Sequence, residues 1–368
     1  MTITPDELLS GWRGRRFLLE YARRSEELAT DPDQPEAPFS SAAMLAGYEL
    51  DPGRGSSVVL VSVGTGSCAA EPVEATPASV ATLLDGVALA AVDQETALRT
   101  LAHAVTVARY WQEPDGEDVL AALPVVRAAL ERVAAHVAGS ADAVGWWSTP
   151  VDRTDQHAVT WDADRTPPAG TAAERLDRWR TDALKEERDA RRQRPADPTA
   201  SWSGTWWSAP PWQLTRTLRS LDGHGPAGLW LVEDDMGWEQ GVTHRVDVPA
   251  GARVYEVDGA EAWAALCRAY PLEVTAQKRH DWYRTTGRDG SWVQPDWAAV
   301  AADHDAVHLT AAAYLAAAGT VIPVGDDTAS VIAGWNPDEA CWLVDTVRPE
   351  PAGRAWVLDD DDWVPAAG

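Results

Sequence analysis

Cysteine is scarce in this chain. Its 368 residues include three cysteines, Cys68, Cys267 and Cys341, and each stands alone in the sequence. An odd number without C-x-x-C spacing excludes a disulfide framework and provides no zinc-binding pattern. We therefore expect neither a disulfide nor a cysteine-based metal site. Cys267 and Cys341 lie in apolar stretches, which predicts that both are small core residues.

Long apolar segments are missing as well. No continuous run reaches the roughly 18 apolar residues that a membrane-spanning helix needs. Residues 1–5 lack the basic and apolar segments of a signal peptide and lead directly into a polar helical pattern. These absences predict a cytoplasmic protein with no membrane partner.

Positive charge is in short supply. Lysine and arginine together number 31 against 57 acidic residues, which gives a formal net charge of −26. Nucleic-acid binding depends on clustered basic side chains that contact phosphates, so this composition argues against it as the main activity. The densest basic run, residues 188–194, is interleaved with acidic residues and is typical of a solvated helix face.

Phenylalanine is scarce and tryptophan is abundant, with 2 Phe against 20 Trp. Eighteen of these tryptophans lie at or after Trp146. Tryptophan buries a large apolar area and also needs a partner for its N–H, so it suits both cores and the walls of pockets. The pattern therefore has two interpretations, a tryptophan-rich core or an aromatic-lined cleft.

The periodicity of apolar residues predicts two regions, residues 1–140 and residues 141–368. The first is mainly helical, with a helix over 6–30 and a buried strand over 56–63. Within 95–138 two antiparallel helices are expected, separated by a turn at 112–116. The second is a Trp-rich α+β domain, with a charged amphipathic helix over 171–193. The predicted fold class is therefore α+β, with a mostly antiparallel twisted sheet and flanking helices, preceded by a mainly helical N-terminal region.

Short apolar runs with aromatic and β-branched residues predict the strands of the second region. The repeated W-W-S-[TA]-P element at 146–150 and 206–210 predicts two neighbouring strands that each end at a proline. Helices are expected around Trp263–Leu266 and Trp297–Val300. The remaining strands are expected at Gly228–Val232, Arg253–Val257, Asp305–Leu309 and Ala340–Val344.

Two motifs that suggest chemistry are contradicted by their sequence context, and a third is absent. Residues 64–69 match G-x-G-x-x-A, but prolines follow where a phosphate-binding helix has to begin, so a turn is expected. His304 and His308 have metal-ligand spacing on a helix, but His304 ends a predicted helix and His308 lies in a predicted strand. No G-x-S-x-G sequence is present to indicate a serine hydrolase.

Residues 202–345 resemble the ADP-ribosyltransferase-like fold through the sequences GLWLVED at 228–234 and RVYEV at 253–257, followed by a Trp-containing helix. The resemblance implies NAD as a cofactor, Trp230 as the aromatic clamp on nicotinamide, and Glu339 as the catalytic carboxylate, with Asp338 as the alternative. The first strand of the family, here Trp206–Ser208, lacks its usual His or Arg, and Arg253 is the candidate substitute. The further cofactor-binding residues expected are Trp207, Ser208 and Thr310.

The chain also resembles uncharacterised actinobacterial proteins that share its D-A-V-H-L run, and this likeness implies no activity. Three functions therefore stay open. The first is a transferase-like enzyme that uses NAD or a similar nucleotide. The second is a non-catalytic binding or biosynthetic accessory protein with an aromatic pocket for a small molecule, and the third is a structural or interaction protein. The sequence leaves the oligomeric state open.

Overall fold

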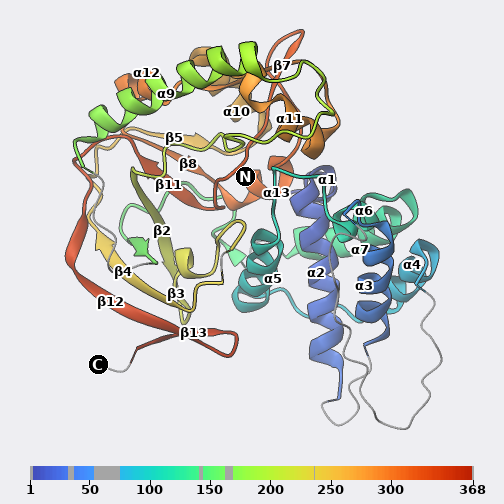
Figure 1. Ribbon diagram of the computed structural model, residues 1–368. Helices are drawn as coiled ribbons and strands as arrows, with labels where there is room; N and C mark the ends of the chain where they lie inside the picture. The colour runs from blue at the N-terminus through green and yellow to red at the C-terminus, as the bar shows by residue number, and fades with distance from the viewer. Residues whose placement is uncertain are drawn as a thin grey trace.

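The computed structural model describes residues 3–31, 37–53, 75–140, 144–161, 169–235 and 237–366 (Figure 1). The strand expected over 56–63, the glycine motif at 64–69 and Cys68 all lie outside these ranges. In the described part, helices dominate up to about residue 140, and the rest combines a large sheet, a small sheet and further helices. The chain therefore has the predicted α+β class with a helical N-terminal region.

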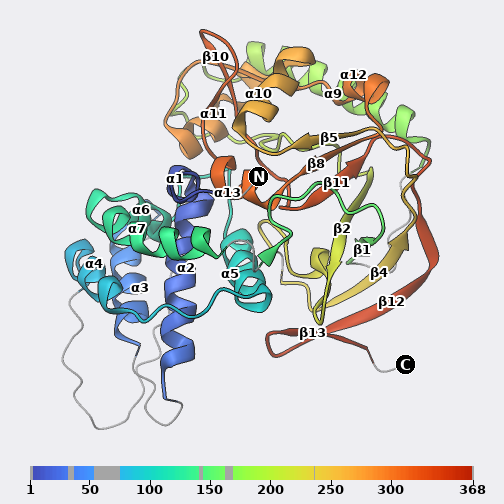
Figure 2. The ribbon, with the colours of Figure 1, turned by 180° about the vertical axis from the view of Figure 1, so that it is seen from behind.

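The N-terminal helices pack around α2, which lies against α5 on one side and α3 and α6 on the other (Figures 1 and 2). The helix expected over 6–30 is divided at Gly11, whose backbone is extended. A Cβ at Gly11 would lie 2.5 Å from the carbonyl oxygen of Ala316, so the break lets the chain approach α13 closely. The helices of this region are α1 (Pro5–Ser10), α2 (Trp12–Ala29), α3 (Pro38–Leu50), α4 (Pro77–Gly86), α5 (Gln94–Thr106), α6 (Gly116–Ala122) and α7 (Pro124–Gly139).

The large sheet has the strand order β13-β12-β4-β1-β2-β11-β8-β5, and the short β3 pairs with β2 at its side. Its pairs are antiparallel except for β5 with β8, which run parallel. The strands are β1 (Gln156–Thr160), β2 (Thr215–Leu221), β3 (Gly225–Pro226), β4 (Gln240–Val246), β5 (Val254–Val257), β8 (Ala306–Leu309), β11 (Glu339–Trp342), β12 (Pro349–Asp359) and β13 (Asp362–Pro365).

A second, smaller sheet and the helices α9 to α13 complete the described C-terminal part. The small sheet has the order β6-β7-β10-β9. Its strands are β6 (Pro271–Glu273), β7 (Ser291–Pro295), β9 (Ile322–Pro323) and β10 (Thr328–Ser330). The helices are α9 (Ala172–Gln193), α10 (Ala260–Ala269), α11 (Thr275–Thr286), α12 (Trp297–Asp303) and α13 (Ala311–Ala317).

Several predicted elements are confirmed. Helix α9 begins at a capping box in which Thr171 accepts from the backbone N–H of Glu174, and it ends at Gln193 as expected. Strands β5, β8 and β11 coincide with the predicted runs, and all four residues of β8 are buried, as its apolar sequence requires. Cys267 and Cys341 are buried free thiols, and burial raises the pKa of each to about 12.

Two strand predictions are wrong. The expected strand at Gly228–Val232 is instead the short 3-10 helix η1 (Ala227–Leu229) and the turn after it. The tight turn at Gly223 and Gly225, both with positive φ, reverses the chain, and Pro226 then ends the β3 ladder after two residues. The W-W-S-[TA]-P segments contain no strand either. The N–H groups of Ser208 and Ala209 both bond to the carbonyl of Ala333, at 2.9 and 3.3 Å, without forming a strand ladder.

Buried tryptophans form much of the C-terminal core, which supports the core interpretation for part of the set. Trp263, Trp297 and Trp335 are fully buried and pack edge-to-face or tilted, with ring centroids 5.9–6.1 Å apart. The indole N–H of Trp263 donates to Ser330, and that of Trp297 donates to the carbonyl of Ser208. Among the described residues, no helix is long and apolar enough to span a membrane.

Candidate functional site

A cleft of about 830 Å³ lies where the N-terminal helices meet the large sheet. Helices α2 and α5 form one wall, and residues around β1, η1, β4, β12 and β13 form the other. The β12–β13 hairpin reaches α5 in both ribbon views (Figures 1 and 2). Arg99 of α5 bonds there to Asp362 and to the carbonyl of Asp361. This volume lies within the range of small-molecule sites, which are typically clefts between substructures.

Four tryptophans define the wall on the sheet side. Trp161, directly after β1, stacks on Trp238 with ring centroids 5.1 Å apart and planes 9° apart. The ring centroid of Trp363, in β13, lies 5.6 Å from that of Trp161. Trp230, directly after η1, is held by a 3.0 Å bond from its indole N–H to the carbonyl of His224. The wall therefore offers large aromatic surfaces whose geometry is fixed by neighbouring rings.

The wall on the helix side is charged. Arg23 and Arg24 project from α2, and Arg99 and His103 from α5. Each arginine already has a carboxylate partner: Arg23 bonds to Glu20 and Glu117, Arg24 to Glu27, and Arg99 to Asp362. The guanidinium of Arg99 also lies over the Trp230 ring, 5.3 Å from its centroid. These cations are therefore neutralised within the protein.

The lining carries more negative than positive groups. It includes three arginines and His103, against the carboxylates of Glu20, Glu27, Asp31, Asp235 and Asp361. An excess of carboxylates beside low-dielectric aromatic walls favours neutral or cationic ligands and disfavours anionic ones. The faces of tryptophan rings add to this preference, because their quadrupole attracts cations.

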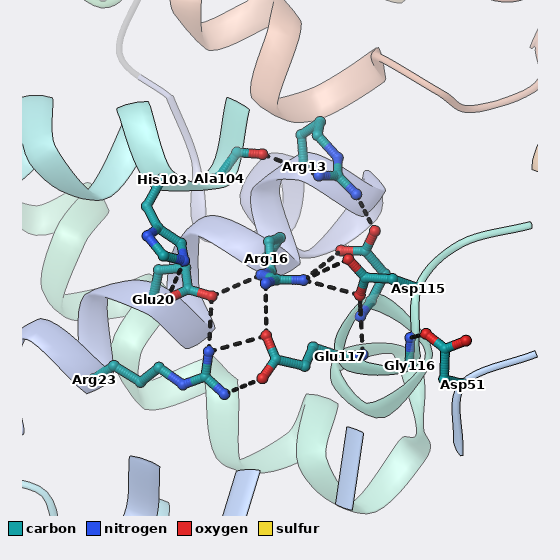
Figure 3. Close-up of polar contacts among 11 residues, drawn as sticks. Arg13, Arg16, Glu20, Arg23, Asp51, His103, Ala104, Asp115, Gly116 and Glu117 are labelled. Carbon is teal, nitrogen blue, oxygen red and sulfur yellow. Dashed lines mark hydrogen bonds and ion pairs between the residues drawn. The ribbon is translucent and has the colours of Figure 1, made fainter. Parts of the chain in front are cut away.

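A buried ion-pair network fixes α2 against α6 (Figure 3). Arg16 bonds to Glu20 at 2.7 Å, to Asp115 at 2.9 Å and to Glu117 at 2.5 Å, and its side chain is 4% exposed. Arg13 pairs with Asp118 and donates to the carbonyl of Ala104. The network holds the helix wall of the cleft in place, since Glu20 and Arg23 belong to both.

The pKa of Glu20 shows which effect dominates in that network. Burial raises this pKa, but the charges of Arg16 and Arg23 outweigh burial and hold it below its usual value. His103 approaches the other oxygen of Glu20 at 3.6 Å. Glu20 therefore remains an ionised carboxylate in the lining of the cleft.

A second buried polar chain crosses the sheet away from the cleft. His308 of β8 bonds to Glu256 at 2.5 Å and to Asp338 at 3.3 Å. Arg219 donates hydrogen bonds to both carboxylate oxygens of Asp338, at 2.6 and 2.9 Å. Burial lowers the pKa of His308, but the two carboxylates outweigh it and raise the pKa to about 9. His304 caps α12 while His308 lies in β8, so the two imidazoles are separated as predicted.

The predicted site residues are distributed over several places. Trp230 lines the cleft. Trp207 is 37% exposed beside Gly334, and Ser208 is buried with its hydroxyl donating to the carbonyl of Val331 at 2.6 Å. Thr310 caps α13 by accepting from the N–H of Ala313. Trp230 is thus the one of these four cofactor-binding candidates that lines the cleft.

The two predicted catalytic residues lie apart. Arg253 is at the surface in an ion pair with Asp305 at 2.7 Å, next to the start of β8. Glu339 faces Leu309 at the other end of β8, where it pairs with Arg216 of β2 and accepts a bond from Asn336 at 3.0 Å. The basic residue nearest Glu339 is therefore Arg216, which the sequence pattern did not single out.

The residues of the cleft that sequence reasoning missed are Trp161, Trp238, Trp363 and Arg99. They come from four separate segments, and none belongs to a local motif. The one signal in the sequence was the concentration of tryptophan after Trp146. No protein-family model, curated protein or solved structure matches this chain.

Proposed function

We propose that the protein binds a flat aromatic small molecule, neutral or cationic, in the tryptophan-lined cleft. The observation that carries the proposal is the stacked pair of Trp161 and Trp238 beside Trp363 and Trp230, in a cleft whose carboxylates outnumber its arginines. Planar rings gain dispersion and quadrupolar attraction from such walls. A positive charge on the ligand adds cation–π attraction and pairs with the carboxylate excess.

Charge is the property that distinguishes this proposal from nucleotide binding. A ligand that carries phosphates meets a lining in which five carboxylates stand against three arginines and His103, and the arginines are already paired with carboxylates. Like charges close together in a partly desolvated site cost free energy. An anionic ring compound is therefore expected to bind less tightly than its cationic counterpart of the same shape.

A matched series of ring compounds tests this expectation. N-methylacridinium, acridine and acridine carboxylate share one ring system and differ in charge at mildly alkaline pH. Isothermal titration calorimetry is expected to give affinities in the order cation, neutral, anion. Trp161→Ala is expected to weaken binding of the cation by about tenfold, because one stacking partner of this kind contributes about 1 kcal/mol or more.

The control is Trp202→Ala, which removes an exposed tryptophan outside the cleft and leaves the affinities unchanged. Equal affinity for all three compounds would refute the charge argument. Unchanged affinity in Trp161→Ala would refute the site itself.

A second candidate is the NAD-dependent transferase that the sequence resemblance implies. The observation in its favour is the ion pair of Arg216 on β2 with Glu339 on the neighbouring β11, because a basic residue on one strand beside a carboxylate on the next suits a nucleotide ribose. The carboxylate would stabilise the oxocarbenium-like state of glycosidic cleavage. Glu339 is buried and bonded to Asn336, so NAD has to displace existing contacts.

Incubation with NAD and detection of released nicotinamide tests the second candidate. The transferase hypothesis predicts that the wild-type protein releases nicotinamide and that Glu339→Gln does not. Glu350→Gln, which changes an exposed glutamate of β12, is expected to keep this activity. Absence of nicotinamide release in the wild-type protein rules the transferase out and leaves the binding proposal in place.

A further inference from the structure

A second, smaller pocket of about 300 Å³ lies on the large sheet, lined from β1, β2, β3, β4 and β12. Its lining includes His157, Arg245 and Arg354 and no acidic residue. This contrasts with the chain as a whole, where acidic residues outnumber basic ones by 57 to 31. The pocket therefore has the opposite charge preference from the tryptophan-lined cleft.

Strand register places its three basic side chains close together. His157 of β1 lies directly opposite Arg245 of β4, and Arg354 of β12 lies opposite Thr243, two residues along β4 from Arg245. Directly opposed residues of antiparallel strands have Cβ atoms about 5 Å apart, and diagonal neighbours about 7–8 Å. The two guanidinium groups, on Arg245 and Arg354, are therefore diagonal neighbours of like charge, and a bound anion would relieve their repulsion.

Arg354 is the basic residue of this group whose charge is most directly available to a ligand, because no carboxylate pairs with it among the described residues. Its guanidinium lies 4.8 Å from the ring centroid of Trp356. Trp356 is in turn fixed by a 2.9 Å bond from its indole N–H to Thr243. Stacking on a fixed ring orients the planar guanidinium, which lowers the entropy lost when it binds an oxyanion.

The other two basic groups are held at the rim. His157 bonds to Asp155 at 2.8 Å, and Arg245 donates to the carbonyl of Thr154 at 3.4 Å while Asp247 stands 4.0 Å from its Nε. Asp155 and Asp247 lie outside the lining. The contacts of Arg245 with Thr154 and Asp247 leave some of its N–H groups available, because the guanidinium has five donors.

We propose that this pocket binds an oxyanion of the phosphate class, with Arg354 as the main contact and Arg245 as the second. Two guanidinium groups offer the paired N–H donors that match phosphoryl oxygens. The site is separate from the tryptophan-lined cleft, because none of its lining residues belongs to that cleft.

Calorimetric titration of the full-length protein with inorganic phosphate tests the proposal, at constant ionic strength maintained with sodium chloride. Methyl phosphate, run in parallel, distinguishes a phosphomonoester from free phosphate. We expect saturable binding of at least one of the two, weakened about tenfold or more in Arg354→Ala, since charge-assisted bonds contribute about 1.5–3 kcal/mol.

The matched control is Arg348→Ala, which removes an exposed arginine just before β12 whose Nε bonds to the carbonyl of Asp345, outside the pocket. It is expected to keep the wild-type affinity. The proposal is overturned if neither anion binds saturably, if Arg354→Ala binds as the wild type does, or if Arg348→Ala loses as much affinity.

Discussion

At the scale of single residues, Glu233 is a carboxylic acid whose surroundings shift its pKa strongly. The residue is partly exposed, but both carboxyl oxygens are buried. Burial raises the pKa of Glu233 to about 8, against the opposing effects of Tyr314 and Arg13. The carboxyl is therefore neutral in the folded protein at neutral pH.

This pKa predicts a dependence of stability on pH. The folded pKa of about 8 is above the ordinary value of 4.5, so the folded state holds the proton over a range where the unfolded state has released it. The free energy of unfolding then falls as pH rises from about 4.5 to about 8 and levels off above that. Glu233→Gln removes this contribution.

Urea denaturation at about pH 5 and about pH 8.5 measures the effect. Relative to wild type, Glu233→Gln is expected to gain stability at the higher pH, by on the order of 3 kcal/mol, and little at the lower pH. His308, with its pKa raised to about 9, and Lys278, with its pKa lowered to about 7, titrate in both proteins and cancel in the comparison. An equal difference at both pH values would contradict the assignment.

At the scale of elements, α2 contributes both core and charge. It buries Phe17, Leu18 and Tyr21 together with Arg13 and Arg16. Buried arginines are tolerated because each is paired with carboxylates of α6, with Asp115 directly before it, or with Glu20 on the same helix. Removal of one partner leaves a buried charge uncompensated, which costs more than the pair contributes when intact.

Arg16→Leu is therefore expected to reduce the free energy of unfolding by about 3–5 kcal/mol. It removes the cation that Glu20, Asp115 and Glu117 share, and leaves Glu20 and Glu117 with Arg23 as their remaining arginine partner. The matched control is Arg24→Leu on the same helix, whose partner Glu27 is 68% exposed, and its expected cost is about 1 kcal/mol or less. Urea denaturation of both variants makes the comparison, and equal losses would show that the network does not stabilise the helix packing.

Elements with a complete local signal could be predicted from the sequence. Helix α9 has a capping box at Thr171 and an amphipathic stripe, and β8 has a continuous apolar run. The segment at Trp206–Ser208 had apolar residues but no ladder partner. Its backbone is satisfied from far along the chain, since the carbonyl of Trp206 accepts from the indole of Trp282 and that of Trp207 accepts from Lys278. No local pattern carries such information.

The acidic run at 359–362 also has one property that its sequence predicts and one that depends on strand pairing. Its charge predicts exposure, and all four residues are exposed. Its position as the turn of the β12–β13 hairpin, with Asp360 in the left-handed region at φ 52°, depends on the pairing of Asp359 with Asp362. This hairpin then supplies Asp361 and Trp363 to the cleft.

At the scale of the whole molecule, the cleft exists because distant segments meet. Its lining comes from α2, α5, the end of β1, the segment around η1 and the β12–β13 hairpin. The composition indicated an aromatic-lined cleft as one of two possibilities, and the molecule contains both a buried tryptophan core and this cleft. Which tryptophans belong to which set depends on tertiary packing, so the sequence alone could not separate them.

The central claim is that a flat ligand binds between Trp161, Trp230, Trp238 and Trp363. The most direct measurement follows the indole N–H resonances of nitrogen-15-labelled protein during titration with N-methylacridinium. We predict shifts for these four tryptophans and none for the fully buried Trp263, Trp297 and Trp335. Shifts confined to Trp206 and Trp207, or no shift of the four cleft resonances at saturation, would contradict the account.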